Sequence, residues 1–207
     1  MKARALSRLW QSLESIPGLL EVPAAWEAAC GPDFALLRPH LRVTDTEGAL
    51  YPCPRAPRAH CPRRIVDLGD GEYIAICRDP LRVCEDVPLA ASDVLLHAVD
   101  LGSLSRILAT PLGVRWQLPE LRGDGTWGIG LSERRDSRGQ PVFLIVLPDT
   151  ARFVTAVQRL TRIGSGPFLL AAPTNQHHTI EAQELLRRRG ATFLPLEDHV
   201  LVNEAGN

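Results

Sequence analysis

The stretch that decides the fold runs from residue 142 to residue 194 and opens with Val142-Phe143-Leu144-Ile145-Val146-Leu147. A continuous apolar run of this length is typical of a strand buried on both faces. The sequence then predicts a helix from Asp149 or Thr150 to about Arg162, a strand at 168–172, a helix at 177–189 and a strand at 192–194. Strand–helix–strand–helix–strand predicts parallel pairing through right-handed crossovers. Residues 91–207 are therefore expected to hold a small parallel α/β domain.

The residues before this stretch predict more helix than strand. Apolar residues recur at the spacing of one helix face between Leu6 and Leu13, which predicts a helix over 3–15. A second helix is expected from Pro23, which suits a first helical turn, to Cys30. Residues 1–50 are thus expected to form a helical N-terminal segment that ends in a strand at 41–43. The fold class predicted for the whole chain is α/β, or α+β overall.

The segment 51–90 differs in character from its neighbours because it holds four of the five cysteines, Cys53, Cys61, Cys77 and Cys84. Between them, β-forming residues at 64–68 and 72–76 flank Asp70-Gly71, which predicts a β-hairpin. A hairpin would bring its two ends, and with them the cysteines, together. Four thiolates at tetrahedral positions make a closed structural zinc site, and zinc is the cofactor that we expect.

The sequence Cys53-Pro54, then His60-Cys61-Pro62, a hairpin, then Cys77 and Cys84 resembles a zinc ribbon over residues 51–88. The resemblance implies a metal-binding ribbon that presents a surface to nucleic acid or to a protein. The gaps of seven and six residues within the two cysteine pairs depart from the usual C-x₂-C knuckles. His60 could replace one sulfur, which would leave Cys53 outside the ligand set. Buried thiols, a disulfide and an iron–sulfur cluster are the alternatives to zinc.

Charge and hydropathy limit the class of protein. The chain has 207 residues and a formal net charge of −1 at pH 7, which argues against a generally cationic nucleic-acid binder. It has no apolar run long enough for a membrane span and no signal-peptide pattern at its start, so a cytoplasmic location and no membrane partner are expected. A local basic cluster precedes the hairpin and is the predicted surface for a protein or nucleic-acid partner: Arg55, Arg58, Arg63 and Arg64.

A second candidate site is the polar loop 173–179, which follows a buried strand and precedes a helix. In parallel sheets, ligands bind beyond the carboxyl ends of the strands. Backbone N–H groups there could bind an anion, and a histidine could act as acid or base. The alternative is that the loop only caps a helix. The candidate ligand-loop residues are Thr174, Asn175, His177 and His178.

The sequence holds no G-x-x-x-x-G-K-[ST], G-x-S-x-G or H-E-x-x-H motif. The leading hypothesis is therefore a zinc-stabilised regulatory or adaptor protein, which may be one subunit of a larger complex. A small-ligand or nucleotide sensor that uses loop 173–179 is the second hypothesis. The third is a hydrolase or nuclease that uses His177 and His178 together with Asp198 and His199.

Overall fold

A computed structural model describes residues 4–5, 7–53, 62–81, 84–123, 125–163 and 166–202. The chain combines helices with β-sheets, as the sequence predicts. It divides into two compact units: unit 1 comprises residues 1–18 and 100–207, and unit 2 comprises residues 19–99. This division differs from the predicted segments 1–50, 51–90 and 91–207.

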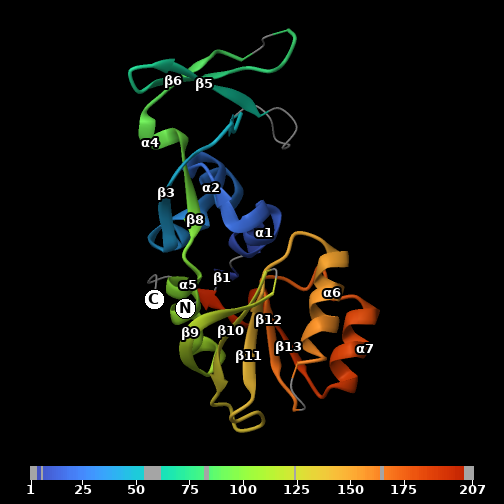
Figure 1. The fold of residues 1–207 in the computed structure, drawn as a ribbon. Coiled ribbons are helices and arrows are strands. Elements are labelled where there is room, and N and C mark those ends of the chain that lie inside the picture. The colour runs from blue at the N-terminus through green and yellow to red at the C-terminus, as the bar shows by residue number, and fades with distance from the viewer. Residues whose placement is uncertain are drawn as a thin grey trace. The chain divides into compact units, whose positions relative to one another are not determined.

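Unit 1 is built on a five-stranded mixed sheet of order β13-β12-β11-β10-β9 (Figure 1). β11, β12 and β13 are parallel, which confirms the prediction for the last third of the chain, and β9, β10 and β11 are antiparallel. The strands are β9 (Val114–Gly123), β10 (Thr126–Ser132), β11 (Pro141–Ile145), β12 (Leu169–Ala172) and β13 (Thr192–Pro195).

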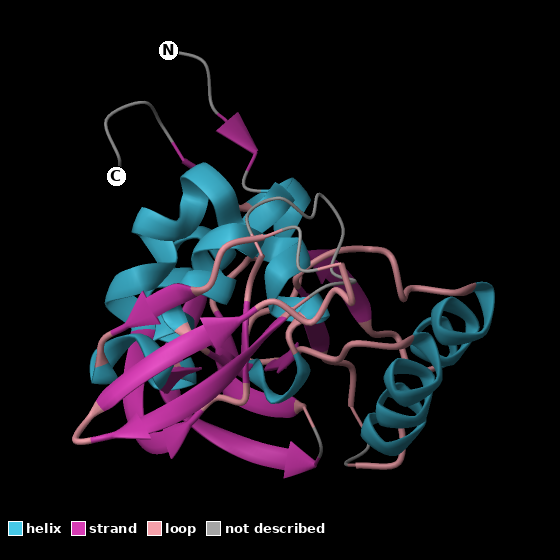
Figure 2. Ribbon diagram, turned by 90° about the horizontal axis from the view of Figure 1, so that it is seen from above, coloured by secondary structure: helices cyan, strands magenta, loops and turns pink. Residues whose placement is uncertain are grey.

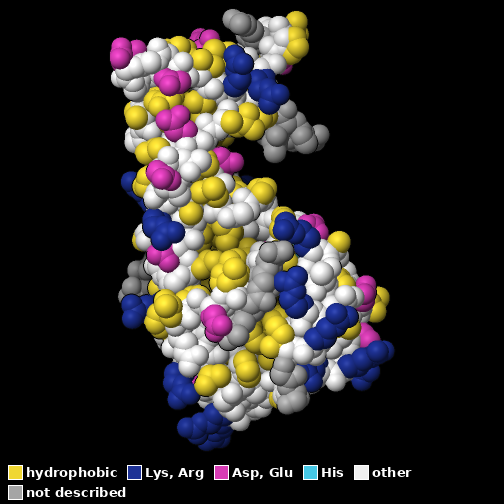
Figure 3. All heavy atoms as spheres, in the orientation of Figure 1, with side chains coloured by type: hydrophobic (Ala, Val, Ile, Leu, Met, Phe, Trp, Pro, Cys, Tyr) yellow, Lys and Arg dark blue, Asp and Glu magenta, His cyan; other side chains and the backbone are white. Residues whose placement is uncertain are grey.

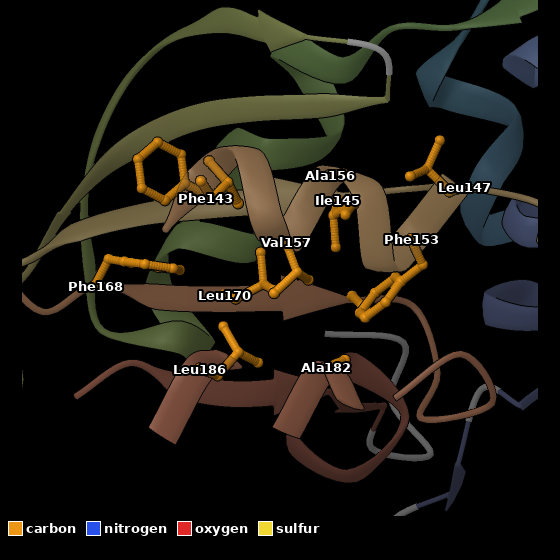
Figure 4. Close-up of a cluster of buried hydrophobic side chains, with 12 residues drawn as sticks. Phe143, Ile145, Leu147, Phe153, Ala156, Val157, Phe168, Leu170, Ala182 and Leu186 are labelled. Atoms are coloured by element: carbon orange, nitrogen blue, oxygen red, sulfur yellow. The ribbon is translucent and has the colours of Figure 1, made fainter. Parts of the chain in front are cut away.

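Two helices, α6 (Thr150–Leu160) and α7 (Ile180–Arg188), lie side by side against one face of this sheet (Figure 2). Their apolar faces pack on Phe143, Ile145 and Leu170 of the strands, and Phe153 and Val157 of α6 are fully enclosed (Figure 4). Asp149 caps α6 by accepting from Arg152 N at 2.8 Å. The cap of α7 is Thr179, so that helix begins later than the predicted residue 177.

The first helix, α1 (Ser7–Ser15), belongs to unit 1 and not to a separate N-terminal segment. The reason is packing, because its apolar face, with Leu9, Trp10 and Leu13, is buried. The strands β1 (Arg4–Ala5) and β14 (Leu201–Val202) also pair. Two more helices complete unit 1, α5 (Leu101–Leu112), which packs on β9, and α8 (Leu196–His199). Pro111 lies inside α5, which ends instead at the left-handed Gly113.

The first part of unit 2 is a three-stranded sheet of order β2-β8-β3 with short helices. The side chain of Trp26 is completely buried, and its Nε1 donates to the carbonyl oxygen of His97 at 2.9 Å. The elements are β2 (Leu20–Glu21), α2 (Pro23–Cys30), α3 (Phe34–Leu37), β3 (Leu41–Glu47), α4 (Ala91–Val94), β8 (Leu95–Val99) and the 3-10 turns η1 (Pro17–Leu19), η2 (Gly31–Asp33) and η3 (Arg38–His40).

The second part of unit 2 is an antiparallel four-stranded sheet, β4-β5-β6-β7, which contains the predicted hairpin. Gly69 pairs with Glu72, and Asp70 and Gly71 both have positive φ, of 54° and 77°. This is the two-residue turn that suits the twist of a hairpin. Its strands are β4 (Leu50–Tyr51), β5 (Arg63–Gly69), β6 (Glu72–Ile76) and β7 (Val87–Leu89).

Candidate functional site

The hairpin positions three cysteines near one end of the four-stranded sheet. Cys53 follows β4, Cys77 follows β6 directly, and Cys84 precedes β7. The Sγ atoms of Cys53 and Cys84 are 3.6 Å apart, although 31 residues separate them in the chain. Cys77 and Cys84 are buried, and none of the described cysteines forms a disulfide. Cys61 and His60 lie outside the described residues.

The electrostatics of Cys84 show that these sulfurs interact. The hydrogen bond with Cys53 raises the pKa of the Cys84 thiol, and burial and the neighbouring charges of Cys53 and Cys77 raise it further. Crowded thiolates repel one another unless a cation lies among them. Cys77 is held in place by its backbone N–H, which donates to Asp86 Oδ1 at 3.2 Å.

The spacing of the sulfurs is compatible with zinc. A zinc–sulfur bond is about 2.3 Å, so two sulfurs on one tetrahedral zinc ion are about 3.8 Å apart. The 3.6 Å between Cys53 and Cys84 is close to that value. The described residues do not complete a site by themselves, since no group of three or more His, Cys, Asp and Glu side chains among them is arranged to hold a metal ion.

Arg63 does not belong to an exposed arginine patch, which corrects the prediction for that residue. Its exposed fraction is only 4%, because it lies where β5 begins and is covered by the segment before β7. Its Nη2 donates to the carbonyl oxygen of Glu85 at 3.1 Å, and its buried Nε has no hydrogen-bond partner. No Asp or Glu of the described chain forms a salt bridge with it. Arg64 is exposed as predicted, whereas Arg55 and Arg58 lie outside the described residues.

Loop 173–179 forms a buried polar network with Glu14 of α1. The Glu14 side chain has an exposed fraction of 2%, and burial raises its pKa. Its carboxylate accepts from Thr174 Oγ1 at 2.6 Å, from Thr174 N at 3.3 Å and from Gln176 Nε2 at 3.0 Å. Each donor is thereby satisfied inside the protein, and α1 is bound to the carboxyl end of β12.

His177 extends the same network. Gln176 Nε2 donates one hydrogen to Glu14, so its other hydrogen is available for His177 Nε2 at 2.9 Å. That assignment leaves His177 Nδ1–H to donate to Thr150 Oγ1 at 3.0 Å. The ring is then neutral, in agreement with its pKa, which burial lowers.

The other candidate residues of this region do not form a reaction centre. His178 stacks on Phe193 with a centroid distance of 4.0 Å, and Asn175 N donates to Glu197 Oε1 at 2.9 Å. Asp198 and His199 are exposed on α8, and no hydrogen bond or ion pair between described residues joins them to His177. The loop therefore serves packing and anchoring in the described structure.

Sequence reasoning missed Glu14, Gln176 and Thr150 as members of this network. One signal was present, because Glu14 lies four residues after Trp10 and so shares the apolar face of its helix. A charged residue on a buried face requires hydrogen-bond partners. The identity of those partners, about 160 residues away in the chain, depends on the tertiary structure.

Unit 2 also has a cleft of about 760 Å³ between α2, α3 and the sheet β2-β8-β3. Its lining includes the ionisable residues Glu27, Arg38, Asp93 and His97. Burial lowers the pKa of His97. Nothing else in the cleft indicates a ligand.

In the described part of the chain, every helix is too short or too polar to cross a membrane. No protein-family model matches the chain, and neither a curated protein nor a solved structure matches it.

Proposed function

We propose that residues 51–88 form a structural zinc module and that the chain is a regulatory or adaptor protein that works through contacts. The observation that carries the proposal is the convergence of Cys53, Cys77 and Cys84, with two sulfurs at a separation that suits one zinc ion. Cys61, the fourth ligand predicted from the sequence, would close the tetrahedron.

The buried arginine supports an anionic centre at this place. A buried guanidinium requires a negative partner, and Arg63 has no carboxylate in the described residues. Zinc with four thiolates carries a net charge of −2, from one Zn²⁺ and four sulfur anions. Arg63 follows the predicted ligand Cys61 by two residues and bonds to the residue after Cys84. It would compensate part of that charge.

A closed four-sulfur site has no open position for a substrate, which favours a structural role over catalysis. Reduced thiols suit a cytoplasmic protein. The exposed Arg64, with Arg55 and Arg58, would face the partner, either another subunit of a complex or a nucleic acid.

The first test is the metal content of the reduced, purified full chain by elemental analysis. We expect about one zinc per chain in the wild type and loss of zinc in Cys77→Ser and Cys84→Ser. Cys30→Ser is the matched control, because Cys30 is equally buried in unit 2 but lies on α2. Metal-free wild type, or equal zinc in all variants, would contradict the proposal.

The second test concerns the partner-facing arginines. The triple variant Arg55→Glu, Arg58→Glu and Arg64→Glu is compared with the wild type for binding to duplex DNA and RNA, in an electrophoretic mobility assay at physiological salt. Binding that the triple variant loses would identify a nucleic-acid partner. Undetectable binding by the wild type would exclude this partner class and leave protein contacts.

A further inference from the structure

The helix-covered face of the sheet in unit 1 is only partly covered. The apolar cluster under α6 and α7 contains residues of β11 and β12, but no described residue of β9 or β10. A groove of about 470 Å³ opens over these two strands. It is called the β9–β10 groove here. Its lining is mainly apolar, with Leu118, Phe143, Ile163 and Phe168, and includes one carboxylate, that of Glu120.

The rim of the β9–β10 groove exposes large apolar side chains. Leu118 has an exposed fraction of 76% and Ile163 one of 42%. Figure 3 shows hydrophobic side chains over β9–β11, with an acidic side chain among them, and dark blue Lys or Arg side chains beside them over α6. An exposed apolar patch bordered by charge is typical of a protein-binding surface.

The charge on α6 is positive, and among the described residues it has no counter-charge within ion-pair distance. Arg152 and Arg159 line a second hollow, of about 180 Å³, between α6 and Leu147 of the same sheet face. Neither arginine forms a salt bridge with a described residue, and α6 contains no Asp or Glu. The contrast is α7, where Arg187 and Arg188 both bind Glu184 at 2.8 Å. The α6 arginines are therefore available to carboxylates from outside.

We propose that this surface binds an acidic amphipathic helix of a partner protein. The apolar side of such a helix would cover Leu118 and Ile163, and its carboxylates would pair with Arg152 and Arg159. These arginines are seven residues apart, about 10 Å along α6, which matches two carboxylates seven residues apart on the bound helix. A nucleic acid would also supply anions, but Phe143 and Phe168 are buried and offer no exposed ring for base stacking. The proposal adds a surface to the adaptor role and does not depend on zinc.

The test is a selection of phage-displayed random peptides of about 16 residues on the full chain, followed by fluorescence anisotropy of the enriched peptides. We expect enriched peptides to combine acidic and apolar residues. Arg152→Glu with Arg159→Glu should weaken their binding by about tenfold or more, and Leu118→Asp should do the same. Arg187→Glu with Arg188→Glu is the control, since it changes the net charge equally on the neighbouring helix.

Circular dichroism checks that each variant remains folded, and zinc content checks that unit 2 is unaffected. The proposal is overturned if no peptide is enriched, or if the α6 and α7 variants bind the enriched peptides equally well. It is also overturned if a single-stranded oligothymidylate binds the wild type more tightly than the peptides and loses its binding in the α6 variant.

Discussion

The five-stranded sheet of unit 1 and the four-stranded sheet of unit 2 are stabilised in different ways. Among the described residues, the first sheet and the helices α6 and α7 bury a cluster of twelve apolar side chains between them. In the part of unit 2 that the structure describes, the second has a cluster of three buried side chains, Ala75, Leu89 and Val94, with partly buried apolar side chains packed against it. So small an apolar cluster supplies little free energy of folding, and the nearby cysteines are the other groups that can hold these strands together. The comparison leads to a prediction: hydrophobic packing stabilises the sheet of unit 1, whereas the proposed zinc ion would stabilise the sheet of unit 2.

The largest effect is expected from removal of the proposed zinc ion. A strong chelator should unfold the strands β5 and β6, because structural zinc contributes on the order of 10 kcal/mol to the folding of small modules. The strands β11 and β12 should remain folded. Hydrogen exchange measured by mass spectrometry separates the two regions. Equal protection of β5 and β6 with and without the chelator would remove the proposed difference between the sheets.

The corresponding test of the sheet in unit 1 is the substitution Leu170→Ala in β12. Leu170 is completely buried in the cluster of unit 1, so its truncation should cost about 2–5 kcal/mol in the free energy of unfolding. Zinc content should stay unchanged. Urea denaturation gives the free energy, and Leu118→Ala at an exposed position should cost less than about 0.5 kcal/mol. Similar losses in the two variants would disagree with the core described here.

A smaller effect is expected from Glu14→Ala. This change leaves the buried N–H and hydroxyl donors of Thr174 without their acceptor and should cost about 2 kcal/mol. The exposed Glu133→Ala is the control in the same urea experiment and should have almost no effect. If both variants match the wild type, the buried network does not anchor α1.

The smallest effect is the pH dependence of unit 1. Burial lowers the pKa values of His177 and His178 below the value of about 6.5 in the unfolded chain. The unfolded state therefore binds more protons in acid, so this stability is fully present above about pH 6.5 and is lost as the pH falls. The urea midpoint should decrease between about pH 7.5 and about pH 5.5.

Glu14 acts in the opposite sense, because its pKa is raised and its contribution to stability decreases as the pH rises above about 4.5. The test therefore compares the wild type with His177→Gln over the same pH range. The variant should show a shallower decrease on acidification. An unchanged pH dependence would mean that His177 is not the group that titrates.

Much of the fold follows from local patterns in the sequence. The apolar run at 142–147 predicted a buried strand, and Asp70-Gly71 between β-forming residues predicted the hairpin. Both predictions were confirmed because each pattern depends on a local property. For the strand this property is burial on both faces, and for the hairpin it is a turn with positive φ. The candidate zinc ligands were also chosen by sequence, since a hairpin brings its own ends together.

Only the tertiary structure decided which groups that are distant in the sequence pack together and form hydrogen bonds. Sequence placed α1 in a separate segment, but Glu14 and the apolar face of α1 are satisfied by residues of the C-terminal part. Sequence also grouped Arg63 with exposed arginines, whereas the fold buries it beside the cysteine segment. Periodicity and turn residues describe neighbours within a few positions, while the partner of a buried charge is set by the packing of distant segments.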